Sequence, residues 1–147
     1  SPGDVLTAAD LNAIGTWSDF TPTWNGSSAA PSIGNGTLTG RYTQIGNVVI
    51  YVVRMTAGST TTFGSGRYDF SLPVAPTNAT AFITTFGSAM LADASTANAE
   101  SATVVAMSGS YATFRRTGGG FGDVTSSLPW TWASGDSISF VATYEVA

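Results

Sequence analysis

The last ten residues before the C-terminal alanine alternate between apolar and polar side chains. Every second position is apolar, and most of the residues between them are polar; the apolar positions are Ile138, Phe140, Ala142, Tyr144 and Val146. Successive side chains of a β-strand point to opposite faces of the sheet, so this alternation predicts a strand with one buried face.

A second segment, Val48–Met55, is apolar almost without interruption. Such a run is typical of a central strand that is buried on both faces or that lies at a contact between subunits. We therefore expect Val49, Tyr51 and Val53 to contact another copy of the chain.

Weaker strand patterns fill most of the remaining chain, and turn residues separate them. Gly46-Asn47 and Gly109-Ser110 each place a glycine first in a two-residue loop, which predicts two hairpins with type II′ turns. Together the segments predict an all-β domain of about eight antiparallel strands, arranged as a β-sandwich or jelly roll. The six weaker strands are expected at Thr21–Trp24, Leu38–Ile45, Arg67–Ser71, Thr80–Ser88, Ala102–Ser108 and Tyr111–Arg116.

A short helix is predicted near the N-terminus. Thr7 and Asp10 have the spacing of a capping box, and Gly15 stands where a helix would end. A helix this short is marginal alone, so it must dock on the domain, on a partner chain or on an upstream shaft. We divide the chain into a linker with this helix (1–16) and a β-sandwich domain (17–147), and we expect a longer protein to continue N-terminally. The candidate oligomer contacts in the linker are Leu6, Leu11 and Ile14.

Composition adds a reason to expect self-association. Hydrophobic residues make up 43% of the 147 residues and charged residues only 10%, whereas about 25% is usual for globular domains. A subunit that buries one flank against copies of itself needs fewer charges there, so we expect self-association. A monomeric secreted β domain is the alternative.

The available chemistry argues against an enzyme. The chain has no His and no Cys, which removes the usual general base, the thiol nucleophile and the best zinc ligands. Its nine carboxylates are scattered singly, so we expect no catalytic pair, no metal and no cofactor. A net charge of −4 makes nucleic acid an unsuitable ligand. No apolar run reaches the ~18–20 residues that a membrane helix needs, so we expect no membrane insertion.

Loops rich in Gly, Ser and Thr are expected at Gly26–Gly36, Gly58–Gly66 and Gly118–Ser127. If the domain binds a ligand, these loops and the aromatic residues near them are the place to look. Trp130 and Trp132 would point the same way on an extended segment and could stack on a sugar ring. A buried corner or an interface is the alternative for this pair. The candidate ligand contacts are Trp130, Trp132, Tyr111 and Phe121.

Six blocks of the sequence, from Gly3–Ile14 at the start to Tyr144–Glu145 at the end, together resemble the C-terminal domains of tail-fibre and minor tail proteins of bacteriophages that infect actinobacteria. Gly3–Ile14 resembles a linker of the form GxxLTAxxLN that leads into such terminal domains. Ala75–Gly122 adds little to the resemblance. The other matching blocks are Phe20–Trp24, Gly36–Tyr42, Gly64–Pro73, Trp132–Asp136 and Tyr144–Glu145.

This resemblance implies a β-sandwich head in the phage tail, outside the cell, that joins an upstream tail or fibre region. It further implies a homotrimer that contacts the host surface, usually through glycans. Avidity from three identical heads would let weak glycan contacts suffice. Two alternatives stay open: a purely structural capsid decoration or head-fibre trimer, and a monomeric carbohydrate-binding module.

Overall fold

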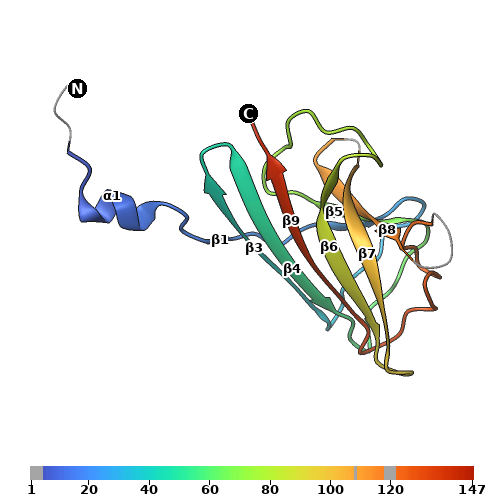
Figure 1. The fold of residues 1–147 in the computed structure, drawn as a ribbon. Coiled ribbons are helices and arrows are strands. Elements are labelled where there is room, and N and C mark those ends of the chain that lie inside the picture. The colour runs from blue at the N-terminus through green and yellow to red at the C-terminus, as the bar shows by residue number, and fades with distance from the viewer. Residues whose placement is uncertain (1–4, 108, 118–121) are drawn as a thin grey trace.

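The computed structural model describes residues 5–107, 109–117 and 122–147, and it shows a mostly antiparallel β fold with one short helix (Figure 1). The described part contains nine strands in one hydrogen-bonded sheet, in the order β1-β3-β4-β9-β6-β7-β8-β5-β2. All paired strands run antiparallel. The elements are α1 (Ala8–Ala13), β1 (Ser18–Asp19), β2 (Trp24–Gly26), β3 (Thr37–Ile45), β4 (Val48–Thr56), β5 (Tyr68–Ser71), β6 (Thr85–Asp93), β7 (Asn98–Met107), β8 (Tyr111–Arg116) and β9 (Ser137–Glu145).

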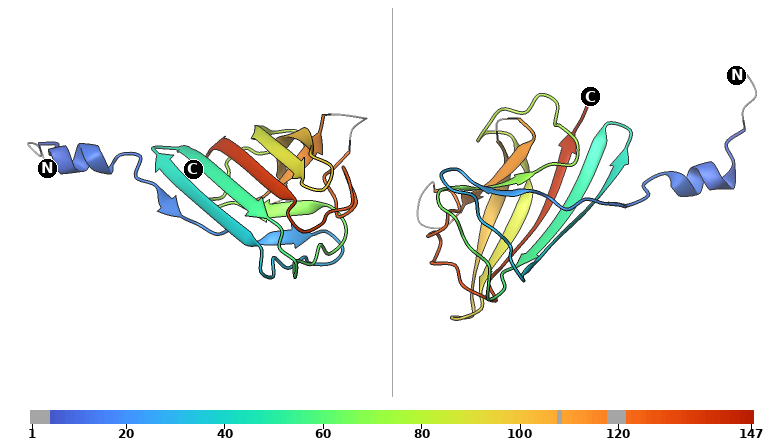
Figure 2. Two further views of the ribbon diagram at one scale, coloured as in Figure 1. Left: turned by 90° about the horizontal axis from the view of Figure 1, so that it is seen from below. Right: turned by 180° about the vertical axis from the view of Figure 1, so that it is seen from behind.

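The sheet curls so that its own inner face provides the core (Figure 2). The ring of Phe140 on β9 lies 5.6 Å from that of Phe70 on β5 and 5.2 Å from that of Phe114 on β8. Neither β5 nor β8 is a sheet neighbour of β9, so these contacts cross the interior. The prediction of an antiparallel all-β fold is confirmed, with one continuous curled sheet rather than two hydrogen-bonded sheets.

One segment joins the two edges of this sheet. β1 pairs with β3 at one edge and β2 pairs with β5 at the other, although only residues 20–23 separate them. Within that link, the Phe20 N–H donates to the Gly40 carbonyl (2.9 Å), and the Ser71 N–H donates to the Thr23 carbonyl (3.0 Å). A Cβ at position 40 would collide with the Phe20 carbonyl oxygen, so the close crossing requires glycine there. Residues 18–26 thus close the curled sheet.

β4 corrects the expectation that Val48–Met55 is buried on both faces. Its burial alternates along the strand, and the side chains of Val49, Tyr51 and Val53 are completely buried inside a single chain. They pack on the core between the two halves of the sheet, so they are not free to contact another copy. The outward positions Val48, Ile50 and Val52 are partly exposed. The apolar run therefore has a simpler cause, because β-branched residues suit both faces of a strand.

Both predicted hairpins form. Ile45 pairs with Val48 across the two-residue turn, and Gly46 has a φ of +58° while Asn47 has no positive φ, as a type II′ turn requires. In the other hairpin Met107 pairs with Tyr111, so the loop has three residues rather than two.

The strand expected at Thr80–Ser88 lies further along the chain, at Thr85–Asp93. Residues 80–84 form a turn in which the N–H groups of Ile83 and Thr84 donate to the Thr80 carbonyl (3.2 and 2.9 Å). The threonine-rich composition of this stretch suits a strand, but these local hydrogen bonds compete with a ladder.

The β6–β7 turn was not predicted, and Asp93 organises it. Its Oδ1 accepts the N–H of Ser95 (2.8 Å) and its Oδ2 accepts the hydroxyl of Thr96 (2.7 Å). Hydrogen bonds from the Ser95 and Thr96 side chains lower the pKa of Asp93, because they favour the charged carboxylate.

The N-terminal arm, which we define as residues 5–17, projects from one end of the sheet (Figures 1 and 2). The predicted capping box is present: the Asp10 N–H donates to Thr7 Oγ1 (3.2 Å), and the Thr7 N–H donates to Asp10 Oδ2 (2.9 Å). Gly15, with a φ of +77°, follows the last turn as predicted.

Phe140→Ala is expected to lower the free energy of unfolding by about 3–5 kcal/mol, because it empties the point where the two halves of the sheet meet. Urea denaturation followed by circular dichroism measures this change. Ile83→Ala, at a side chain that is 74% exposed, is the control and should stay within about 0.5 kcal/mol of the parent. Equal effects of the two substitutions would contradict a shared core at Phe140.

Asp93→Ala is expected to destabilise the domain at neutral pH and to lose this effect in acid. The folded carboxylate has a pKa below the ordinary 3.8, so its contribution is present above that value. The contribution disappears as the pH falls through the lower, folded pKa. Denaturation of both proteins between pH 7 and pH 2 tests this, with Asp19→Ala as a control because the Asp19 carboxylate is 96% exposed. A gap between Asp93→Ala and the parent that persists at the lowest pH would contradict the assignment.

Candidate binding surface

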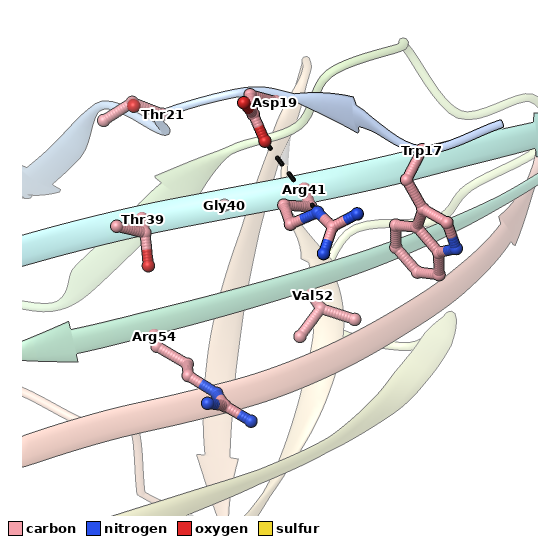
Figure 3. A pocket seen from close by; sticks show the side chains of 8 residues that line it. All are labelled: Trp17, Asp19, Thr21, Thr39, Gly40, Arg41, Val52 and Arg54. Atoms are coloured by element: carbon pink, nitrogen blue, oxygen red, sulfur yellow. Dashed lines mark ion pairs between the residues drawn. The ribbon is translucent and has the colours of Figure 1, made fainter.

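A hollow of about 680 Å³ opens on the outer face of the sheet, over β1, β3 and β4 (Figure 3). Its volume lies in the range of small-molecule sites, roughly 300–1,000 Å³. We call it the Trp17 hollow. It is lined by Trp17, Asp19, Thr21, Thr39, Gly40, Arg41, Val52 and Arg54.

The β3–β4 hairpin brings two arginines to this hollow. Its register places Arg41 opposite Val52 and Thr39 opposite Arg54. These side chains all project on the same side of the sheet, and Val52 lies between the two arginines (Figure 3). Arg41 and Arg54 are diagonal neighbours, a relation that usually separates side chains by roughly 7–8 Å.

The chain just before the sheet supplies the other wall. The Arg41 guanidinium lies 5.4 Å from the centre of the Trp17 ring, within the range of a cation–π contact. Arg41 Nε is 3.8 Å from Asp19 Oδ1, and the two side chains are 61% and 96% exposed. An ion pair this long and this exposed adds little stability, so Asp19 leaves Arg41 accessible.

The other three arginines differ because each has a close acidic partner. Arg67 lies 2.8 Å from Asp69, Arg116 lies 2.7 Å from Glu100 and Arg115 lies 3.4 Å from Asp123. The hydrogen bonds that Arg67 donates to Asp69, and that Arg116 donates to Glu100, raise the pKa of the two arginines. Among the described residues, Arg54 alone of the five arginines has no carboxylate within 4.0 Å. The Trp17 hollow therefore carries a net positive charge on a protein that is acidic as a whole.

A second hollow, of about 800 Å³, lies over β7 and β8. Phe82 lies there between two arginines, with its ring 5.2 Å from the Arg67 guanidinium and 4.9 Å from that of Arg115. These arginines already face Asp69 and Asp123, so their charge is balanced within the chain. This balance makes the second hollow the weaker candidate for a charged ligand.

The aromatic residues predicted to contact a ligand lie elsewhere. The Trp130 and Trp132 rings are 5.5 Å apart, so the pair is adjacent as expected. Trp132 is only 4% exposed and its Nε1–H donates to the Thr125 carbonyl (2.8 Å), which makes it a core residue rather than a ligand contact. Trp130 is half-buried against the core, and Tyr111 is half-buried at the start of β8. Phe121 lies outside the described residues.

The linker residues predicted to contact other copies are exposed. Leu6, Leu11 and Ile14 are 70%, 55% and 59% exposed, and α1 contains no buried residue. Nothing within a single chain covers their apolar surface along the described part of the arm.

The lining of the Trp17 hollow is poor in carboxylates. Asp19 is the one carboxylate in its lining, whereas hydrolysis of a glycosidic bond would need two. Within the described residues there is no group of three or more Asp, Glu, His or Cys that could hold a metal ion. The helix that the structure describes is too short to cross a membrane.

Sequence reasoning missed this hollow although one signal for it was available. The predicted Gly46-Asn47 turn fixes the register of its hairpin, and that register alone puts Arg41 and Arg54 on one face. No sequence signal of this kind predicts the position of Trp17. Trp17 reaches the hollow because the segment that follows it, residues 18–26, begins by pairing with the edge of β3.

Comparisons with models of known protein families, with curated proteins and with solved structures return no match to this chain.

Trp132→Ala is expected to lower the free energy of unfolding by about 3–5 kcal/mol, since it removes a buried ring and its hydrogen bond. Trp17→Ala is the matched control: its ring is 40% exposed and should cost less than about 1 kcal/mol. Chemical denaturation of both variants, monitored by circular dichroism, gives the comparison. A larger loss at Trp17 would contradict the assignment of Trp132 to the core.

Proposed function

We propose that this chain is a non-enzymatic head domain of a bacteriophage tail-fibre or minor tail protein, located in the virion tail outside the cell. It assembles as a homotrimer through its N-terminal arm and attaches to glycans of the host surface. The resemblance of its sequence blocks to such proteins motivates the proposal. The exposed apolar arm is the structural observation that carries it.

The arm contains a helix that is well capped at its N-terminus but packs on no other part of the described chain. Thr7 and Asp10 form both hydrogen bonds of a capping box, so the sequence encodes a helix at this place. Six residues are far fewer than the ~12–15 that an isolated helix needs in water. Val5, Leu6, Leu11 and Ile14 nevertheless remain 55–83% exposed. Such a helix gains its stability from packing on another chain.

Identical arms are the simplest partners. Leu11 lies in the helix and Ile14 is its C-cap, three residues further along the chain, so copies of the arm can bury this exposed apolar pair against one another. The arm carries Asp10 as its one described charge, which limits repulsion between copies. Three arms together would leave the curled sheets apart, since each arm projects beyond the end of its sheet (Figure 1).

The finer description of the head belongs to the same proposal. A curled sheet whose halves pack face to face corresponds to the β-sandwich or jelly-roll head that the resemblance implies. Assembly through the arm leaves the outer faces of three such heads free for host contact. Three weak glycan sites on one assembly would then act together.

The solution mass tests this proposal. Light scattering of the parent chain at micromolar concentration is expected to give about 45 kDa, three times the 15.0 kDa of one chain. The double variant Leu11→Asp, Ile14→Asp places charges on this apolar pair and is expected to give about 15 kDa, the mass of one chain. Ile83→Asp, at an apolar side chain on the sheet domain that is 74% exposed, should keep the trimer mass. A monomeric parent would overturn the assembly and favour a single carbohydrate-binding module.

A further inference from the structure

We infer that the Trp17 hollow binds a sugar ring that carries a single carboxylate, such as a uronic acid unit of a polysaccharide. This inference deepens the proposed function, on which it rests for the source of the sugar, because it names both the site and the chemical class of the glycan. The charges, the apolar surface and the hydroxyl groups of the hollow all match such a ligand.

The charges of the hollow match one negative charge. Arg41 and Arg54 supply two positive charges and Asp19 one negative charge, which leaves a net charge of about +1. The chain as a whole carries −4, and its other arginines lie against their own carboxylates. Arg41 has only the long, exposed ion pair with Asp19, and Arg54 has no carboxylate within 4.0 Å among the described residues. The two arginines on one face of the hairpin therefore repel each other mildly, and an anion between them would relieve this repulsion.

The arginines also suit the shape of a carboxylate. A guanidinium presents a planar fork of N–H donors that can bind both oxygens of a carboxylate at once. Arg54 is free to do so because, among the described residues, no carboxylate lies within reach of it. The cation–π contact with Trp17 restrains the Arg41 guanidinium, so the position of this group is partly fixed before a ligand binds.

The rest of the lining fits a sugar ring rather than a bare anion. Trp17 offers an exposed aromatic ring, and the C–H face of a pyranose stacks on such rings. Val52 is half-buried between the arginines and lies opposite Val141 in the sheet, which makes the floor apolar. Thr21 and Thr39 line the end away from Trp17 and can exchange hydrogen bonds with sugar hydroxyls (Figure 3).

Asp19 argues against a more highly charged ligand. A phosphate monoester carries about −1.5 to −2 at neutral pH, and the exposed Asp19 carboxylate would repel the second charge. A nucleic acid would place several phosphates along the face, where this acidic chain supplies too few cations. A neutral sugar would leave the arginines without a partner. A sugar with a single carboxylate avoids all three problems: it adds only one negative charge, it does not need a row of cations, and it gives the arginines an acidic partner.

Isothermal titration calorimetry with a short oligomer of glucuronic acid tests the inference, and the glucose oligomer of equal length is the neutral comparison. Three identical sites per trimer should bind the glucuronic acid oligomer, and raising the salt concentration should weaken the binding. Arg54→Ala is expected to weaken it roughly 10-fold or more, and Trp17→Ala to a similar extent, because each loses a principal contact. Arg54→Lys keeps the charge without the fork and should fall between the parent and Arg54→Ala.

Arg115→Ala is the matched control, because it removes an arginine from the second hollow and should leave binding within about twofold of the parent. Circular dichroism of each variant confirms that it is folded. Equal binding of the glucose oligomer, equal or tighter binding of glucose 6-phosphate, or unchanged binding after Arg54→Ala would each overturn the inference. Absence of binding by the parent chain at millimolar oligomer would overturn it as well.

The mass of the same samples separates this inference from the proposed function. A parent chain with trimer mass that fails to bind glucuronic acid would overturn the site and leave the assembly intact. A monomeric parent that binds glucuronic acid and loses binding in Arg54→Ala would support the site and overturn the assembly.

Discussion

The fold depends on one constraint: a large sheet with one apolar face has no other layer to cover it. The only helix in the described residues lies out on the arm, so the sheet must curl until its halves meet. The contacts of Phe140 with Phe70 and Phe114 mark that meeting. Closure by residues 18–26 follows from the same need, because a curled sheet with open edges would expose both the core and unpaired backbone groups.

The same curl explains why the candidate binding surface lies on the outside of the sheet. The interior is filled with aromatic and aliphatic side chains, and burial raises the pKa of Tyr144 to about 12 and raises that of Tyr51 and Tyr68 further, so these phenols stay neutral. The Trp17 hollow lies where the arm enters the sheet, so one short stretch of chain helps both to close the core and to build the candidate site.

Much of the fold could be predicted from sequence, and the errors have physical causes. Alternation identified β9, and turn chemistry at Gly46-Asn47 identified the β3–β4 hairpin with its register. β6 was placed too early because Thr80–Thr84 has strand-like composition but forms its own hydrogen-bonded turn. Sequence left Trp132 open between a ligand contact and a buried corner, because spacing shows which side chains share a face and not whether solvent reaches that face. The Trp17 hollow joins residues from three elements, and the register of the β3–β4 hairpin was the only feature from which part of it could have been predicted.

The closing segment also determines how the domain would respond to tension. A pull on the arm enters the sheet at β1, whose pairing with β3 involves two residues, and passes next to β2, which pairs with β5 at the opposite edge. Mechanical load on the N-terminus is therefore applied to the seam of the curled sheet, which is the place where residues 18–26 link its two edges, rather than to a free tail. Unzipping would begin at Ser18 and would open the seam before it disturbed the nine-residue pairing of β4 with β9.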